Sequence, residues 1–299
     1  MGQVLRINDA LLMDLTQIER ILVNIRGKSN GIIYNNHTLA IDYPCWLVNS
    51  MITEYSAIVC LLCNVSDIRT IDFGAIQDIL RSIVEKYADS LNFSCYGDKY
   101  SNYLWFLNKA SDKRYARTAK KAGQEYIIDE YNNKKNIDEY INEVTQKAES
   151  LRDKLKEFDE FSTYTRFDRN TRYLLLTTLG SEKAQKELIP PITLTFNKTL
   201  KLYDSRLSQI IHNNPTTKKM SNPDKACEII RTLIYALYGS QYAFLHYYES
   251  NESLFRDNSF VSIKNDINIC IERLLDLANK VGEVHSDNTG VMLQWKWLW

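Results

Sequence analysis

The chain has 299 residues, enough for one large domain or two ordinary ones. Its 44% hydrophobic and 25% charged residues are average for a globular protein, which excludes disordered, collagen-like and mucin-like chains. Because 37 basic residues balance 37 acidic ones, no overall charge draws the protein to nucleic acid or to an anionic membrane. Any site for a polyanion must therefore be a local patch.

Glycine and proline are scarce, with ten and five residues. So few turn residues cannot supply the many tight turns of a sandwich, barrel or propeller, and we predict an all-α protein. Glycine-rich phosphate loops are absent from the sequence. The N-terminus matches neither a signal peptide nor a myristoylation site, and the longest apolar run, residues 57–63, is far below the ~20 residues that span a bilayer. We expect a cytoplasmic protein without a membrane partner.

Apolar residues at helical spacing predict helices over residues 8–25 and 73–93. We expect Asn8 or Asp9 to cap the first helix and Gly27 to end it, with a loop over 27–36. After Pro44, residues 46–65 predict a buried helix. Beyond Pro190-Pro191 we expect helices over 194–211, 225–248 and 259–281, with a polar loop over 215–223.

Six cysteines spread through the chain are typical of reduced thiols rather than of a disulfide framework. Cys60 and Cys63 have CxxC spacing, but no second ligand pair accompanies them, so we expect them to be packed in the core. No metal and no cofactor is predicted.

The most regular pattern is a heptad seam between residues 137 and 158, formed by Ile137, Ile141, Val144, Ala148, Leu151, Leu155 and Phe158. A matching seam lies upstream at Tyr115, Ala119, Ala122 and Tyr126, and residues 132–136 read as a polar turn. We predict an antiparallel, coiled-coil-like helical hairpin over 112–162, inserted in a helical bundle of residues 1–110 and 163–290. The aromatic tail, 291–299, is expected to pack into this core or into a partner protein.

Basic residues form two rows that are candidate RNA-binding sites. The first row is on the predicted hairpin and comprises Lys113, Arg117, Lys120 and Lys121. The second row comprises Arg166, Arg169 and Arg172, interleaved with Tyr164, Phe167 and Tyr173. The alternative is a solvated face whose charge is balanced by Glu125, Asp129 and Glu130.

Histidine, the commonest acid–base catalyst, occurs four times, at positions 37, 212, 246 and 285. We expect His246 to be a hydrogen-bonded core residue. His212 is the catalytic candidate, because Ser208 lies one helical turn before it and Tyr203 and Arg206 precede it. Arg206 and His212 do not share a helix face, so only a bent helix end or a second protomer brings them to one phosphate. The alternative is a structural set that cross-links a bundle.

The string Tyr-x-x-x-Leu-Ser-x-x-x-His at 203–212, preceded by Arg81-x-x-x-Glu85, resembles an uncharacterised family of bacterial all-helical proteins. The Arg206–His212 spacing is also similar to the signature of HEPN domains, which are helical ribonucleases of toxin–antitoxin and antiphage systems. This resemblance implies a dimer with one metal-independent RNA-cleaving site. The arginine would hold the scissile phosphate and the histidine would manage the 2′-hydroxyl proton.

Two functions are therefore expected. The first is a HEPN-like endoribonuclease of a bacterial toxin or antiphage defence system, acting on RNA as a homodimer. The second is a non-catalytic helical subunit that engages a partner protein through the hairpin and the Trp-rich tail.

Overall fold

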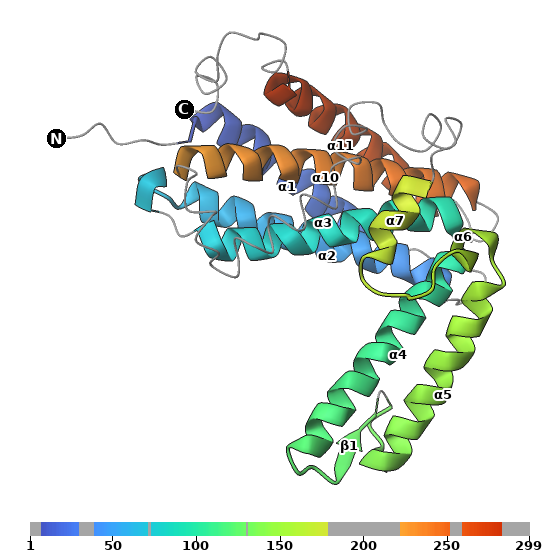
Figure 1. Cartoon of the computed structure of the whole chain (residues 1–299). Helices are drawn as coiled ribbons and strands as arrows, with labels where there is room; N and C mark the ends of the chain where they lie inside the picture. Colours follow the sequence, from blue (N-terminus) through green and yellow to red (C-terminus); the bar gives the residue numbers. More distant parts are fainter. Residues whose placement is uncertain are drawn as a thin grey trace. The chain divides into compact units, whose positions relative to one another are not determined.

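The computed structural model describes residues 7–29, 39–70, 73–129, 131–178, 222–251 and 259–282. Of these residues 84% are helical, and two three-residue strands form the remaining regular structure, which confirms the all-α class. The chain divides into two compact units (Figure 1). Unit 1 comprises Met1–Cys95 and Leu179–Trp299, and unit 2 is the continuous segment Tyr96–Thr178.

Unit 1 is a bundle of long helices, within which α1 packs against α2 and α11, and α10 packs against α2 and α11. Its elements are α1 (Asp9–Ser29), α2 (Leu39–Cys63), the short 3-10 helix η1 (Ile68–Thr70), α3 (Phe73–Tyr96, of which only the last residue falls in unit 2), α10 (Asn222–Ser250) and α11 (Ser259–Gly282). Two segments far apart in the sequence thus build one core.

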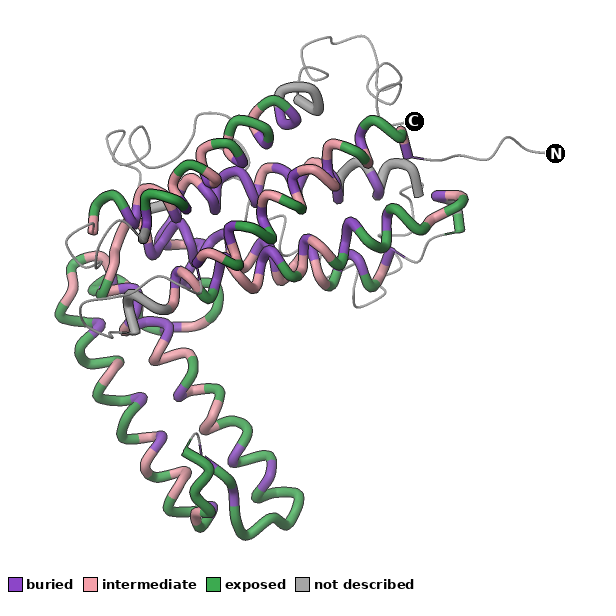
Figure 2. The backbone as a smooth tube through the Cα atoms, turned by 180° about the vertical axis from the view of Figure 1, so that it is seen from behind, coloured by how far each residue is buried: buried purple, intermediate pink, exposed green. Residues whose placement is uncertain are grey.

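The apolar residues that predicted α1 face the core. Five of them are at most 1% exposed: Leu11, Leu15, Ile18, Leu22 and Ile25. The predicted cap also forms, because Asn8 Oδ1 accepts a 2.8 Å hydrogen bond from the Ala10 N–H. Buried residues recur along the helices of this unit between exposed ones (Figure 2). Helical periodicity therefore located the core.

Three predicted helix boundaries are wrong. α1 continues through Gly27 to Ser29, because one glycine costs only about 0.5–1 kcal/mol in a helix and the next turn buries Ser29. α2 begins before Pro44 rather than after it. α10 begins at Asn222, with Pro223 in the first turn, where a missing N–H breaks no helical hydrogen bond.

One described segment, Tyr43–Cys63 of α2, is long and apolar enough to cross a membrane by length and composition alone. This segment is much longer than the uninterrupted apolar run at 57–63 because it includes scattered polar residues. Core helices meet the same criterion, and α2 packs against α1 and α10.

Unit 2 is built on two helices, α4 (Asp98–Lys121) and α5 (Ile137–Lys156), which lie side by side and run antiparallel (Figure 1). Between them an antiparallel ribbon pairs β1 (Tyr126–Ile128) with β2 (Lys134–Asn136). α4 begins well before residue 112, the expected start of the hairpin. The short helices α6 (Asp159–Ser162) and α7 (Thr171–Thr178) follow α5.

Of the seven residues predicted for the α5 side of the hairpin seam, Ile137, Val144, Ala148 and Leu155 are buried, and Ile141, Leu151 and Phe158 are half-buried. The α4 side is wrong. Ala119 is buried, but Tyr115 is 63% exposed and Tyr126 lies in β1, where it is 51% exposed. The residues expected to form a polar turn, 132–136, include all of β2. Ile127 of the ribbon packs with Ala116, Ala119 and Ile137, which holds the strands onto the helices.

Candidate nucleic-acid interface

The first predicted basic row lies on α4, near the end that leads into the ribbon. At 100° per residue, Lys113, Arg117, Lys120 and Lys121 span an arc of about 100° round the helix, and Arg114 extends it. Arg114, Arg117 and Lys121 are exposed and Lys113 is half-buried. The local sequence explains the cluster, since residues 109–121 hold six basic side chains and one acid.

Most of this row has no carboxylate partner among the residues that the structure describes. Lys120 is the exception, because its ammonium pairs with Asp138 at the start of α5. We call Lys113, Arg114, Arg117 and Lys121 the basic face of α4. Phosphate contacts are the chemistry that such unpaired, neighbouring cations suit.

Aromatic side chains do not interleave with the basic face. Tyr115 precedes Arg117 by two residues, which places it about 160° away round α4. The other exposed apolar side chains of this region belong to the ribbon and its turn: Tyr126, Ile128 and Tyr131 are 51%, 60% and 74% exposed. Lys134 places its ammonium 4.3 Å from the centre of the Tyr126 ring.

The ribbon is held by a buried carboxylate, Asp129, in the turn between its strands. Asp129 Oδ1 accepts hydrogen bonds from the N–H groups of Tyr131 and Asn133 at 2.9 and 2.8 Å, and Oδ2 lies 3.3 Å from Lys135 Nζ. Partial burial raises the pKa of Asp129, but these hydrogen bonds outweigh it and lower the pKa to about 2. Lys135 also binds Glu143 of α5 at 2.5 Å. Asp129 is thus engaged within the ribbon and does not balance the basic face.

The second predicted basic row does not form. Arg166 and Arg169 are exposed and lie in the irregular segment before α7, whereas Arg172 is inside α7 and only 6% exposed. Of the three aromatic residues of this row, Phe167 and Tyr173 are buried in unit 2 and Tyr164 is half-buried, so they do not form an exposed stacking surface. The i+3 spacing is not helical here, since α7 begins only at Thr171.

Arg81 and Glu85, the supporting motif, form an i,i+4 pair on α3, with Nε and Oε1 3.5 Å apart. Both side chains are about one-quarter exposed. The catalytic candidates Tyr203, Arg206, Ser208 and His212 lie outside the described residues, as do the helix expected over 194–211 and the aromatic tail.

His246 is hydrogen-bonded, as predicted, but it is half-buried rather than a core residue. Its Nδ1 lies 2.9 Å from Ser94 Oγ, a bond that joins α10 to α3. The prediction for the CxxC pair is wrong, since Cys60 and Cys63 are both exposed on α2. Their apolar neighbours suggested burial, but only some faces of α2 meet other helices. Among the described residues, no three His, Cys, Asp or Glu side chains gather as a metal site would require.

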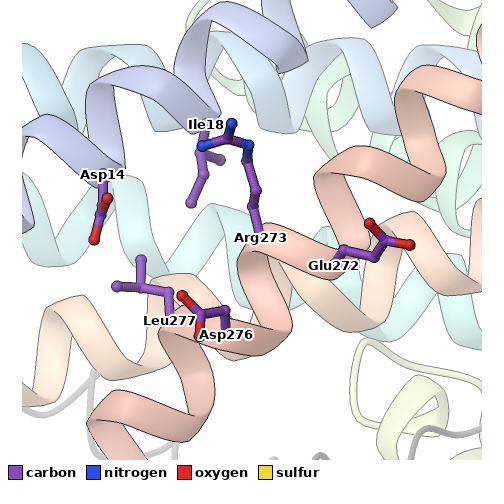
Figure 3. A pocket seen from close by; sticks show the side chains of 6 residues that line it. All are labelled: Asp14, Ile18, Glu272, Arg273, Asp276 and Leu277. Carbon is purple, nitrogen blue, oxygen red and sulfur yellow. The ribbon is translucent and has the colours of Figure 1, made fainter.

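A pocket of about 280 Å³ lies between α1 and α11, lined by Asp14, Ile18, Glu272, Arg273, Asp276 and Leu277 (Figure 3). Three carboxylates line it without meeting: the Glu272 side chain points away from Asp14, and Leu277 lies between Asp14 and Asp276. Arg273 donates a 2.7 Å hydrogen bond to Gln17 of α1. The Arg273–Gln17 hydrogen bond therefore joins α11 to α1. The three carboxylates are not arranged as a cation site.

A second pocket, of about 530 Å³, lies between α4 and α5. It is lined by Trp105, Lys109, Gln146, Lys147, Ser150 and Leu151. This pocket was not predicted from the sequence. A signal was present in the i,i+4 spacing of Trp105 and Lys109, but the facing residues could be paired only once α4 was known to start at Asp98.

Comparisons of the chain with family models, curated proteins and solved structures found no match. The HEPN resemblance therefore rests only on the motif residues given above.

Proposed function

We propose that the protein is a HEPN-like, metal-independent endoribonuclease of a bacterial toxin or antiphage defence system, and that it holds RNA on the basic face of α4. One observation carries the RNA part of this proposal: four neighbouring cations on one helix have no carboxylate partner within the described ranges. Exposed, unpaired cations repel one another, and a polyanion relieves this repulsion.

The fate of the candidate acids also supports a phosphate site. The solvated-face interpretation needs Glu125, Asp129 and Glu130 to balance the basic rows. Asp129 is bonded within the ribbon, Glu125 is exposed with no ion pair among the described residues, and Glu130 lies outside those residues. The proposal places the cleavage chemistry on Arg206 and His212, with Arg206 on the scissile phosphate and His212 as the acid–base group. Tyr203 and Ser208 would position His212.

RNA binding is tested by fluorescence anisotropy with a labelled single-stranded 20-mer over a salt series. Replacing Arg117 and Lys121 by Gln removes two phosphate contacts, so the negative slope of log K against log salt should become less steep by about 1.4. The matched control replaces Lys154 and Lys156 by Gln, because both are exposed lysines on α5. Equal effects of the two variants would contradict a site on α4.

Cleavage is tested separately with total RNA, with and without EDTA. His212→Ala and Arg206→Ala should abolish cleavage, since acid–base groups typically contribute 10²–10⁴-fold in rate, and EDTA should change nothing. The melting temperature should stay the same in both variants. The enzyme proposal would be contradicted if both variants melted at a lower temperature and the unsubstituted protein cleaved no RNA.

The alternative, a non-catalytic subunit that engages a partner protein, is favoured by one observation. Tyr126, Ile128 and Tyr131 gather three exposed apolar side chains in a ribbon of a few residues, and such patches commonly mark protein interfaces. The measurement is the toxicity of the expressed protein to the cell. Under this alternative, replacing all three residues by Ser should abolish toxicity, whereas His212→Ala should not. The ribonuclease proposal predicts that His212→Ala abolishes toxicity.

A further inference from the structure

The pocket between α4 and α5 has a lysine–aspartate ion pair at its wall. The Lys109 side chain is only 6% exposed, which is rare for a lysine. Its ammonium lies 3.2 Å from Asp112 Oδ2 and 5.5 Å from the centre of the Trp105 ring. A carboxylate and an aromatic face therefore keep this charge in place at the pocket wall.

The opposite wall comes from α5 and is polar at its rim. Gln146, Lys147 and Ser150 are exposed there, and Leu151 is half-buried. Lys147 Nζ binds Glu143 Oε1 at 2.7 Å, so this second ammonium is also held near the pocket. The Gln146 amide offers two donors and an acceptor, and the Ser150 hydroxyl offers one donor and two acceptors.

These walls combine an indole, an aliphatic side chain, an amide and two ammonium groups, each of which already pairs with one carboxylate. An indole stacks with flat aromatic rings and an amide reads the polar edge of a heterocycle. An ammonium has three N–H donors, so each lysine can bind a phosphate beside its carboxylate. The volume, about 530 Å³, is within the usual range for pockets that take small organic ligands. A nucleotide is the ligand that uses all of these groups together.

We propose that the pocket between α4 and α5 binds one nucleotide, with its base against Trp105 and its phosphate toward Lys109 and Lys147. The inference deepens the proposed function and rests on it for the idea that RNA is a source of the nucleotide. A free mononucleotide is the other source with the same chemistry.

The test uses the full-length protein labelled with 5-fluorotryptophan and observed by ¹⁹F NMR. Trp105→Phe assigns the signal of Trp105 among the five tryptophans. AMP should shift this signal in a saturable way, while ribose 5-phosphate, which lacks a base, should leave it in place. A single-stranded pentanucleotide that competes with AMP identifies an RNA strand as the source, and AMP binding without competition identifies free nucleotide. Absence of any AMP shift overturns the proposal.

Two matched variants keep the test specific. Ser150→Phe fills the pocket from an exposed helix position, so it should weaken AMP binding at least tenfold without unfolding the protein. Ser111→Phe adds the same ring at an exposed position of α4 that does not line the pocket, and it should leave AMP binding unchanged. Equal binding by both variants would overturn the proposal.

The two proposals can fail separately. The Arg117→Gln and Lys121→Gln variant should retain AMP binding, because neither residue lines the pocket. If the chain binds AMP but no RNA, the proposed function fails and the pocket stands. If RNA binds to α4 and AMP does not shift Trp105, the pocket proposal fails and the RNA proposal stands.

Discussion

Gly239 of α10 lies in close contact with the Tyr87 ring of α3. A Cβ at residue 239 would lie 2.4 Å from Tyr87 Cε2 and 2.9 Å from Tyr87 Cζ, and the Tyr87 side chain is fully buried. A side chain at residue 239 would therefore force this buried ring to shift. This contact explains why the smallest residue stands at this point of α10.

Gly239→Ala should lower the free energy of unfolding by about 1–3 kcal/mol, because the added methyl group overpacks the core. The matched control is Gly27→Ala in α1, where nothing lies within 4 Å of the added atom. This control should stabilise the protein by about 0.5–1 kcal/mol, since alanine favours helix more than glycine does. Urea denaturation of both variants checks the opposite signs, and equal signs would contradict the packing described for Tyr87.

Asp129 gives the ribbon a defined sensitivity to acid. Its pKa of about 2 in the folded protein is below the ordinary value of 3.8, so the charged form is favoured by folding. This contribution is fully present above about pH 4 and is lost as the pH falls toward 2.

Carboxyl NMR titration should place the midpoint of Asp129 near pH 2. Asp129→Asn should remove this acid sensitivity from the ribbon amides, as hydrogen exchange can measure. A midpoint close to 4 in the native protein would show that the turn does not bind the carboxylate as described.

At the scale of elements, α4 and α5 form a pair with unequal seams. Leu155 of α5 is fully buried, whereas Tyr115, which the heptad spacing placed in the α4 seam, is 63% exposed. Leu155→Ala should therefore cost about 2–5 kcal/mol, and Tyr115→Ala should change stability by no more than about 0.5 kcal/mol. Chemical denaturation followed by circular dichroism measures both. A large loss of stability in Tyr115→Ala would show that Tyr115 packs between α4 and α5 after all.

Periodicity predicted the helices of unit 1 and the buried side of α5 because those patterns are local. Periodicity failed for the α4 side of the seam, because Tyr126 belongs to a strand. This strand is held by the packing of Ile127 against Ala116 and Ala119. A three-residue strand has no sequence signal that stands apart from this packing. Charge spacing predicted three residues of the basic face, but it missed Arg114 and included Lys120, which pairs with Asp138. The exposure of Cys60 and the burial of Arg172 depend on which neighbouring elements cover them.

At the scale of the whole molecule, the aromatic cluster of unit 2 determines where the hairpin can be shortened. Phe161 packs its ring 6.4, 6.0 and 6.1 Å from the rings of Tyr96, Tyr103 and Phe167. Replacing residues 112–162 by a Gly/Ser linker would remove Phe161 from this cluster. Replacing only 114–142 removes the small cluster around Ile127 as a complete set and leaves Phe161 in place.

The shorter replacement should therefore preserve the cooperative melting transition, and the longer one should lower the melting temperature. Differential scanning calorimetry of both proteins measures the difference. Identical melting of the two proteins would show that Phe161 contributes little to unit 2.

Because unit 1 is built from two segments that are far apart in the sequence, the ribosome makes its packed helices at different times. α1 and α2 emerge early, but their partners α11 and α10 are at the other end of the chain. At about 5–20 residues per second, translation from residue 96 to residue 282 takes roughly 10–40 s. During that interval the apolar stripe of α1 has no partner from α11, while residues 96–178 can fold as soon as they leave the exit tunnel. Nascent chains of this protein should therefore need chaperone cover over their first 95 residues until the last helix is made.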